Sequence, residues 1–173
     1  MTRSLAAAVL AVLLLAGCAS APPSAASSRF RSLVLVETSG GSPETETFVS
    51  RFLLVLSEAG LGNVADARLA GAKIGMLRDA ASPEASRFRG RYPGDAYLGL
   101  TLDPCGYAGR GTGISCTVTL LLLSPDGKEA ARFDTSGSNA TLITGADDKS
   151  PEAEASRAAA EKAARKLLGL VTR

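Results

Sequence analysis

Alternating apolar and polar segments divide the chain into short strands and helices, and the clearest group lies between residues 95 and 135. Three runs predict consecutive β-strands, at 95–102, 114–123 and 129–135. The second and third are joined by Ser-Pro-Asp-Gly-Lys at 124–128, where proline presets φ and glycine accepts the positive φ of a hairpin bulge. The pattern predicts a three-stranded meander as the centre of the fold.

A cysteine lies at each end of the loop that joins the first two strands. Cys105 and Cys116 form an even pair, and closing their short loop would stabilise the fold by roughly 3 kcal/mol. A redox-active pair is the alternative, but the spacing is not Cys-x-x-Cys, so a structural disulfide is favoured. In the register that this disulfide suggests, the opposed residues are Leu102 with Thr119 and Leu98 with Leu123.

The first half of the chain alternates strand and helix. Residues 30–38 contain a continuous apolar run, typical of a buried strand covered on both faces. Ser-Pro-Glu at 42–44 then predicts a helix start, and Gly60 its end. We expect a short strand at 63–68 and a short helix at 69–79 that two glycines weaken. The apolar stripe of the first helix consists of Phe48, Phe52, Leu56 and Ala59, with Val49, Leu53 and Val55 beside it.

The same Ser-Pro-Glu signal recurs at 82–84 and 150–152, predicting a short helix and a long closing one. The closing helix has an apolar stripe and an outer Glu161–Arg165 pair at i, i+4 spacing. These elements predict a single α/β (α+β) domain over 30–173. Its mixed, mostly antiparallel sheet would have about four to five strands, with two long helices and one or two short ones. The stripe of the closing helix is Ala160, Ala164, Leu167 and Val171.

Residues 1–17 carry the features of a secretory signal peptide, namely Arg3, a short apolar run and small residues before a cleavage point. The sequence Leu15-Ala16-Gly17-Cys18 resembles the bacterial lipobox, which implies that Cys18 is lipidated. An ordinary secretory signal and a transmembrane anchor are the alternatives, although the apolar run is short for a membrane span. Residues 18–29 would form the lipid anchor and a flexible tether, of which residues 19–28 reach at most about 35 Å.

Ala19 follows the lipobox cysteine, where lipoproteins retained in the inner membrane of enteric bacteria commonly have aspartate. The resemblance therefore implies a chain anchored at the periplasmic face of the outer membrane of a Gram-negative bacterium. The membrane would be one partner, through the acyl chains.

Composition excludes several function classes. The net charge of +2 falls to +1 without Arg3, so nucleic acid is an improbable partner. The chain has no histidine, which excludes His-based triads and His-ligated metals, and it has no tryptophan. No metal or other cofactor is predicted, and no motif names a catalytic residue.

The candidate partner-binding residues form a basic and aromatic cluster at 87–92 and a glycine-rich loop. The cluster could meet lipid phosphates, lipopolysaccharide or an acidic partner. Its alternative is a solvated loop whose arginines satisfy local carbonyls and carboxylates. The loop 109–113 superficially resembles a phosphate-binding loop, but strands on both sides favour a flexible hairpin loop. The candidate residues are Arg87, Arg89, Arg91, Tyr92 and Arg110.

Two short patterns resemble one family of envelope proteins. Gly-Asp-Ala-Tyr-Leu-Gly-Leu at 94–100 and Val-Thr-Leu-Leu-Leu-Leu-Ser-Pro-Asp-Gly-Lys-Glu at 118–129 are similar to strands of this group. It includes the amino-terminal domain of the translocation protein TolB, the curli secretion lipoprotein and the lipoprotein activators of penicillin-binding proteins. The resemblance implies a helix-flanked mixed sheet that binds other envelope proteins. The paired cysteines, and a glycine-broken second helix, depart from the pattern.

Neither specific function of the group transfers readily. A curli-type pore needs long amphipathic membrane hairpins, and an activator that reaches the inner membrane needs a longer tether. We therefore expect a non-catalytic protein-binding or assembly component of the envelope, of unknown oligomeric state. An accessory subunit of a secretion or pilus apparatus is the first alternative. The second is an envelope hydrolase using carboxylates, which would need a deep pocket gathering two or more of Asp95, Asp103, Glu129 and Asp134.

Overall fold

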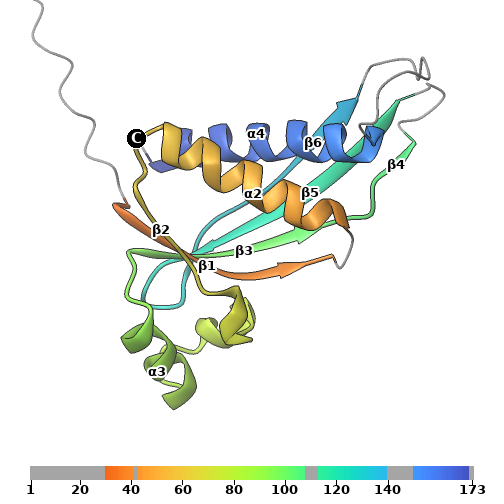
Figure 1. The fold of residues 1–173 in the computed structure, drawn as a ribbon. Helices are drawn as coiled ribbons and strands as arrows, with labels where there is room; N and C mark the ends of the chain where they lie inside the picture. Colours follow the sequence, from red (N-terminus) through yellow and green to blue (C-terminus); the bar gives the residue numbers. More distant parts are fainter. Residues whose placement is uncertain (1–29, 41–42, 108–112, 140–149, 172–173) are drawn as a thin grey trace, which may run out of the picture.

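One mixed β-sheet carries two long helices on one face and a shorter helical segment on the other (Figure 1). The computed structural model describes residues 30–40, 43–107, 113–139 and 150–171. In chain order the elements are β1 (Ser32–Ser39), α2 (Pro43–Glu58), β2 (Asn63–Asp66), the 3₁₀ helices η1 (Arg68–Ala70) and η2 (Ile74–Arg78), α3 (Pro83–Arg91), β3 (Ala96–Leu102), β4 (Gly106–Tyr107), β5 (Ile114–Leu123), β6 (Glu129–Asn139) and α4 (Pro151–Val171).

The sheet confirms the predicted fold class. The described strands lie in the order β2-β1-β3-β5-β4, and β6 also pairs with β5. β3 and β4 pair with successive parts of β5, and β6 pairs along its whole length on the opposite edge. β1 runs parallel to β2 and β3, whereas β3, β4 and β6 are antiparallel to β5. The predicted meander is therefore β3-β5-β6, and the additional strand is the two-residue β4. Gly127 has φ of +82° in the turn between β5 and β6, as the hairpin bulge requires.

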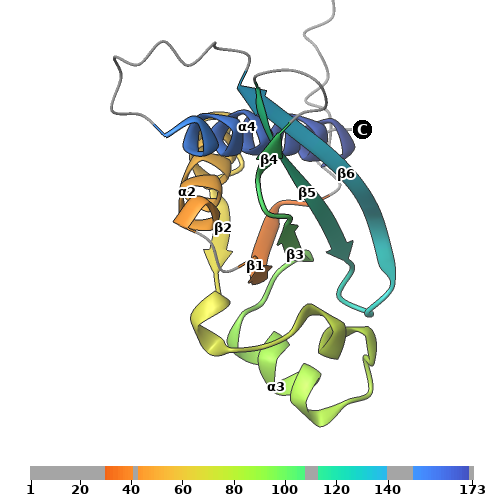
Figure 2. The same ribbon diagram turned by 90° about the vertical axis from the view of Figure 1, so that its right-hand side faces the viewer.

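Apolar side chains fill both faces of the sheet, which explains the continuous apolar run of β1. Leu33 and Leu35 lie in the core under α2 and α4, while Val34 and Val36 lie in a second, smaller core. That second core is covered by residues 67–92, which Figure 2 shows on the opposite side of the sheet from the two long helices. The prediction of a strand covered on both faces is confirmed.

The long helices pack against the sheet and against each other. The predicted stripe of α4 is fully buried, and Gly137 of β6 lies against the α4 backbone, where a Cβ would come within 2.0 Å of the Ala159 nitrogen. Arg51 of α2 pairs with Glu161 of α4 at 2.6 Å, and Glu161 also meets Arg165 at 3.8 Å. Alanine and glycine therefore let α4 approach the sheet closely.

The predicted register between the first two strands of the meander is wrong by one residue. Leu102 lies opposite Val118 and Leu98 opposite Leu122, rather than opposite Thr119 and Leu123. The even-numbered residues of β3 and β5 are the apolar ones that face the large core, and this alternation fixes their register. The cysteines follow the register of β4 instead, in which Gly106 pairs with Ser115, because one extra residue is accommodated at 103–105.

Residues 69–79 do not form the predicted helix. They contain η1 and η2, separated at Gly71, which adopts φ of +70°. Ile74 of η2 packs onto Gly99 of β3, where a Cβ would lie 2.9 Å from the Ile74 side chain. The close approach of the segment to the sheet is therefore built around a missing side chain.

Candidate functional site

The start of β1 is joined to the start of β3 by a cluster of hydrogen bonds. The Asp95 carboxylate accepts the backbone N–H groups of Arg31 at 2.8 Å and Ser32 at 3.0 Å. The Asp95 N–H in turn donates to the Ser32 hydroxyl at 3.0 Å. The Arg31 N–H, helped by Ser32, holds the pKa of Asp95 below its usual range. Residues 31 and 32, at the start of the described domain, are thus held beside the segment that connects α3 to β3.

Helix α3 carries most of the predicted basic cluster, which is therefore not a loop. Pro83 at the first helical position and Glu84 in the first turn favour a helix start here, although the Ser82 side chain makes no capping hydrogen bond. The helix turns Ala85 and Phe88 into the second core. Arg87 and Arg91, four residues apart, are both exposed on the helix surface.

Arg89 has a different environment from the other two arginines. Its Nη2 donates to the carbonyl oxygen of Leu77 at 2.5 Å, and its guanidinium lies 5.9 Å from the centroid of the Tyr97 ring. Its Nε is buried and has no hydrogen-bond partner among the described residues. Burial raises the pKa of Tyr97, and the Arg89 charge opposes this shift. Arg89 therefore joins α3 to η2 and β3 rather than extending outward.

Tyr92 is partly buried at the end of α3. Its ring centroid lies 5.0 Å from that of Phe88, with the two rings tilted by 38°, and its carbonyl oxygen accepts the Tyr97 hydroxyl at 3.1 Å. The Arg91 guanidinium lies 5.5 Å from the centroid of the Tyr92 ring. Of the predicted cluster, the structure thus leaves Arg87 and Arg91 on the surface. The other predicted residues Cys18 and Arg110 lie outside the described residues.

The predicted disulfide is present between Cys105 and Cys116. It joins the residue just before β4 to the third residue of β5. Tyr107 beside it is 78% exposed, which sequence reasoning did not single out. The disulfide supports the base of the 106–113 loop, of which residues 108–112 lie outside the described part of the chain.

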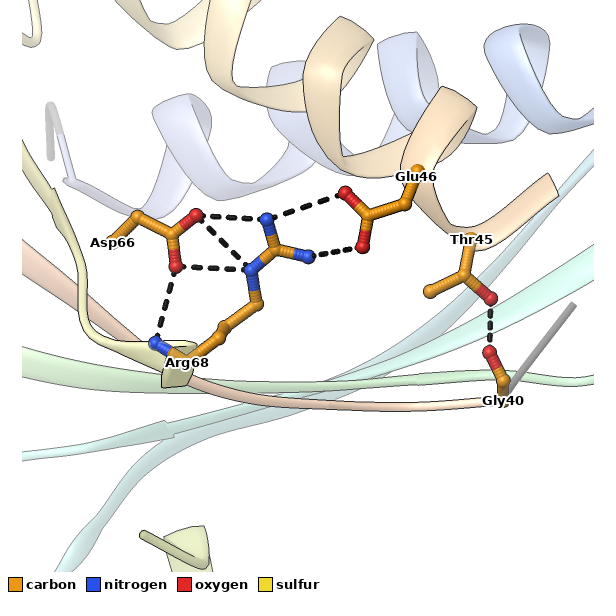
Figure 3. A network of polar contacts seen from close by, with 5 residues as sticks. All are labelled: Gly40, Thr45, Glu46, Asp66 and Arg68. Carbon is orange, nitrogen blue, oxygen red and sulfur yellow. Dashed lines mark hydrogen bonds and ion pairs between the residues drawn. The ribbon is translucent and has the colours of Figure 1, made fainter. Parts of the chain in front are cut away.

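A hollow of about 480 Å³ lies where β1 and β2 end. Its lining includes a charge network that the sequence did not predict, which Figure 3 shows. Arg68 contacts Asp66 at 2.8 Å and Glu46 of α2 at 2.8 Å. The Arg68 hydrogen bond holds the pKa of Asp66 down, and Asp66 raises the pKa of Arg68. Nearby, the Thr45 hydroxyl donates to the Gly40 carbonyl. Two carboxylates already balance Arg68, so the network serves to join η1, β2 and α2.

A bulge in β1 places Glu37 on the sheet face opposite the long helices. The bulge lies between Leu35 and Glu37, and the Glu37 carboxylate accepts the Lys73 ammonium at 2.9 Å and the Ile74 N–H at 2.8 Å. Beyond it, Ser39 donates to the Thr101 hydroxyl at 2.9 Å. Part of this face is consequently polar. A row of register neighbours crosses four strands there, consisting of Ser39, Thr101, Thr119 and Asp134.

The four carboxylates weighed for hydrolysis lie on different parts of the sheet. Asp95 precedes β3 and Asp103 follows it, at opposite ends of that strand. Glu129 pairs with Arg78 at 3.0 Å and Arg132 at 3.3 Å, and Asp134 lies further along β6. The hollow of 480 Å³ is lined by none of the four. Within the described ranges, no three Asp, Glu or Cys side chains could hold a metal ion together, and no helix has the length and apolarity to cross a membrane.

Comparisons with known proteins show the fold. No protein-family profile and no curated protein matches the chain. Among solved structures, the PelC dodecamer from Paraburkholderia phytofirmans aligns with a TM-score of 0.52 and 13% identity, over 84% of this chain and 91% of PelC. The hypothetical protein CT253 from Chlamydia trachomatis aligns with a TM-score of 0.54 and 10% identity, over 80% of this chain and 96% of CT253. At these identities the likeness extends to the fold alone.

The lipoprotein GNA1162 from Neisseria meningitidis is a further match, with 19% identity and a TM-score of 0.42. The alignment covers 62% of this chain and 82% of GNA1162.

Proposed function

We propose that the chain is a lipid-anchored envelope protein that acts by binding other envelope components and not by catalysis. Lipidation at Cys18 would hold it at the periplasmic face of the outer membrane. The observation that carries the proposal is the fold likeness to PelC, which extends over 84% of this chain. The dispersed carboxylates are consistent with a role in binding, because Asp95 and Glu129 are already engaged with backbone N–H groups and arginines.

The anchor is tested by labelling cells with radioactive palmitate and recovering the protein. We expect the wild type to carry label and to enter the detergent phase, and Cys18→Ser to lose both properties. Cys105→Ser with Cys116→Ser controls for the thiols, since these cysteines pair with each other. An unlabelled wild type that retains residues 1–17 would overturn the anchor.

The partner is tested by capturing the tagged, lipidated protein from detergent-solubilised envelopes and identifying what is retained. Arg87→Ser with Arg91→Ser is the informative variant, because these two side chains are exposed and Arg89 is held by Leu77. Arg157→Ser is the matched control, because it removes an exposed arginine from α4 instead of α3. Recovery of no envelope component above an untagged strain would count against a binding role.

A subunit of a larger assembly is the second candidate, favoured by the description of PelC as a dodecamer. Under this proposal several copies of the chain would associate in the envelope. Native mass spectrometry of the detergent-extracted protein measures the number of copies. A ring-sized mass would support the assembly, whereas a monomer at the highest concentrations reached would exclude it.

A further inference from the structure

We propose that α3 lies against the anionic phosphate headgroups of the membrane to which the chain is anchored. The contact surface consists of Arg31, Arg87 and Arg91 and is called the tether-side surface below. The proposal rests on the lipid anchor proposed above and adds an orientation to it. In this orientation, the end of the domain that carries α3 faces the bilayer.

The position of α3 follows from the junction between the domain and residues 1–29. Asp95 binds the backbone of Arg31, and it comes only four residues after Arg91. The register of Leu33 with Ala96 places the starts of β1 and β3 at the same end of the sheet, and the chain from α3 arrives at that end (Figure 1). Residues 19–28 reach at most about 35 Å. A membrane anchor at residue 18 would therefore keep α3 within reach of the headgroups.

The tether-side surface keeps a net positive charge, because its three arginines outnumber the two carboxylates beside them. Among the described residues, its three arginines form no ion pair, whereas Arg51, Arg68 and Arg78 each do. Two carboxylates lie nearby. Asp95 accepts two backbone N–H groups and is also attracted to the Arg31 charge, and Glu84 lies in the first turn of α3. Guanidinium groups without carboxylate partners are suited to phosphate, which they can bind through two N–H donors.

The helix that presents these arginines is held firmly to the domain. The ring centroid of Phe88 lies 6.2 Å from that of Tyr97 and 5.0 Å from that of Tyr92. Arg89 donates a hydrogen bond to the Leu77 carbonyl. Arg87 and Arg91 are one helical turn apart, so they extend from the same side of α3. A preformed pair of cations on a fixed helix loses little conformational freedom when it meets a charged surface.

The experiment uses a tryptophan reporter in the lipidated full chain, which has no tryptophan of its own. Ser86→Trp places the reporter on α3, and Ser138→Trp places it at the opposite end of the sheet. Both serines are exposed. Each protein is reconstituted into vesicles of phosphatidylglycerol or of phosphatidylcholine with brominated acyl chains, which quench nearby tryptophan. We expect quenching at position 86 in phosphatidylglycerol vesicles and little at position 138.

Arg87→Ser with Arg91→Ser in the Ser86→Trp protein should lower the ratio of docked to undocked α3 about 25-fold. This corresponds to about fivefold for each arginine near an anionic surface. Arg157→Ser with Arg165→Ser removes two exposed arginines of α4 and should leave the quenching unchanged. High salt should reduce the quenching as the double serine variant does.

Three results would overturn the proposal: equal quenching at positions 86 and 138, equal quenching in both lipids, or no effect of the two serines on α3. Vesicle flotation tests the anchor separately, since a chain without acyl groups would not float. The same reporter is then measured with vesicles added in excess. Quenching at position 86 in that case supports the tether-side surface without the anchor, and its absence overturns the surface as well.

Discussion

At Gly137 strand β6 comes very close to the backbone of helix α4. A Cβ at this position would lie 2.0 Å from the Ala159 nitrogen and 2.6 Å from the Ala155 carbonyl oxygen. Both are backbone atoms of α4, so neither can move aside without shifting the helix. The backbone of α4 can come this close only because β6 has no side chain there.

Gly137→Ala is therefore expected to lower the free energy of unfolding by about 3 kcal/mol, measured by urea denaturation. Gly169→Ala is the matched control, because it lies in α4 with no atom within 4 Å of the added Cβ. It should raise the free energy of unfolding by about 0.5 to 1 kcal/mol through helix propensity. Similar stabilities for the two variants would contradict this account of the contact.

Asp95 makes the stability of the domain depend on pH in the acid range. Its pKa is lowered in the folded state from the ordinary 3.8, so the unfolded chain binds the proton first. Its contribution is complete above that value and is lost as the pH falls through the lower folded pKa. Asp95→Asn should therefore be less stable than wild type at pH 7, with the difference closing in strong acid. Urea midpoints across this range measure it, and Asp134→Asn, also exposed, controls for the loss of a charge. A difference independent of pH would refute the assignment.

At the scale of the elements, β6 is a long edge strand that α4 protects. The Lys162 ammonium donates to the Ser136 carbonyl at 3.0 Å and the Lys166 ammonium to the Asp134 carbonyl at 3.2 Å. Lys166 also lies 4.6 Å from the centroid of the Phe133 ring. An edge whose carbonyls are occupied by lysines is a poor template for another strand.

Lys162→Ser with Lys166→Ser should consequently increase self-association several-fold over wild type. Sedimentation velocity and light scattering at equal concentration measure the change. Lys128→Ser removes an exposed lysine from the β5–β6 turn and should behave as wild type. An unchanged distribution of species would mean that the two lysines do not protect the edge.

Local sequence signals sufficed for most elements. The Ser-Pro-Glu triplets marked where α3 and α4 begin, and the apolar run of β5 gave its bounds at 114–123. They did not suffice where packing decided the structure. The register of β3 depends on one residue accommodated before Cys105, and η2 is positioned by the packing of Ile74 on Gly99. Strand β6 continues to Asn139, beyond the predicted end, because its pairing with β5 persists.

The candidate site was predictable only in part. The arginine cluster was evident, but helical spacing was needed to separate exposed Arg87 and Arg91 from Arg89. Gly90 weakened the helix signal there. The Asp95–Arg31 and Arg68–Glu46 contacts join residues 64 and 22 positions apart in the sequence. No local pattern encodes such contacts.

At the scale of the whole molecule, the sheet separates two cores of unequal size. The larger includes Leu167 of α4, and the smaller includes Leu77 of η2. The segment 67–92 over the smaller core contains short helices only, so we expect it to open before the rest of the domain unfolds.

Hydrogen exchange distinguishes this order of opening. Leu167→Ala should reduce the protection of amides in α4 and β5 by about 3 kcal/mol and leave residues 67–92 unchanged, because it affects the native and partly opened states equally. Leu77→Ala should reduce protection in both regions, because it destabilises only the native state. If Leu167→Ala weakens residues 67–92 as much as α4, the domain opens as one unit.

The position of β1 has a mechanical consequence. It lies between two parallel neighbours, and its first residues are bound to Asp95. Tension applied at residue 30 along the strand would load both ladders in shear, with their hydrogen bonds resisting together instead of breaking one after another. A domain built this way withstands pulling at residue 30 better than pulling on β6, which could peel from a single partner.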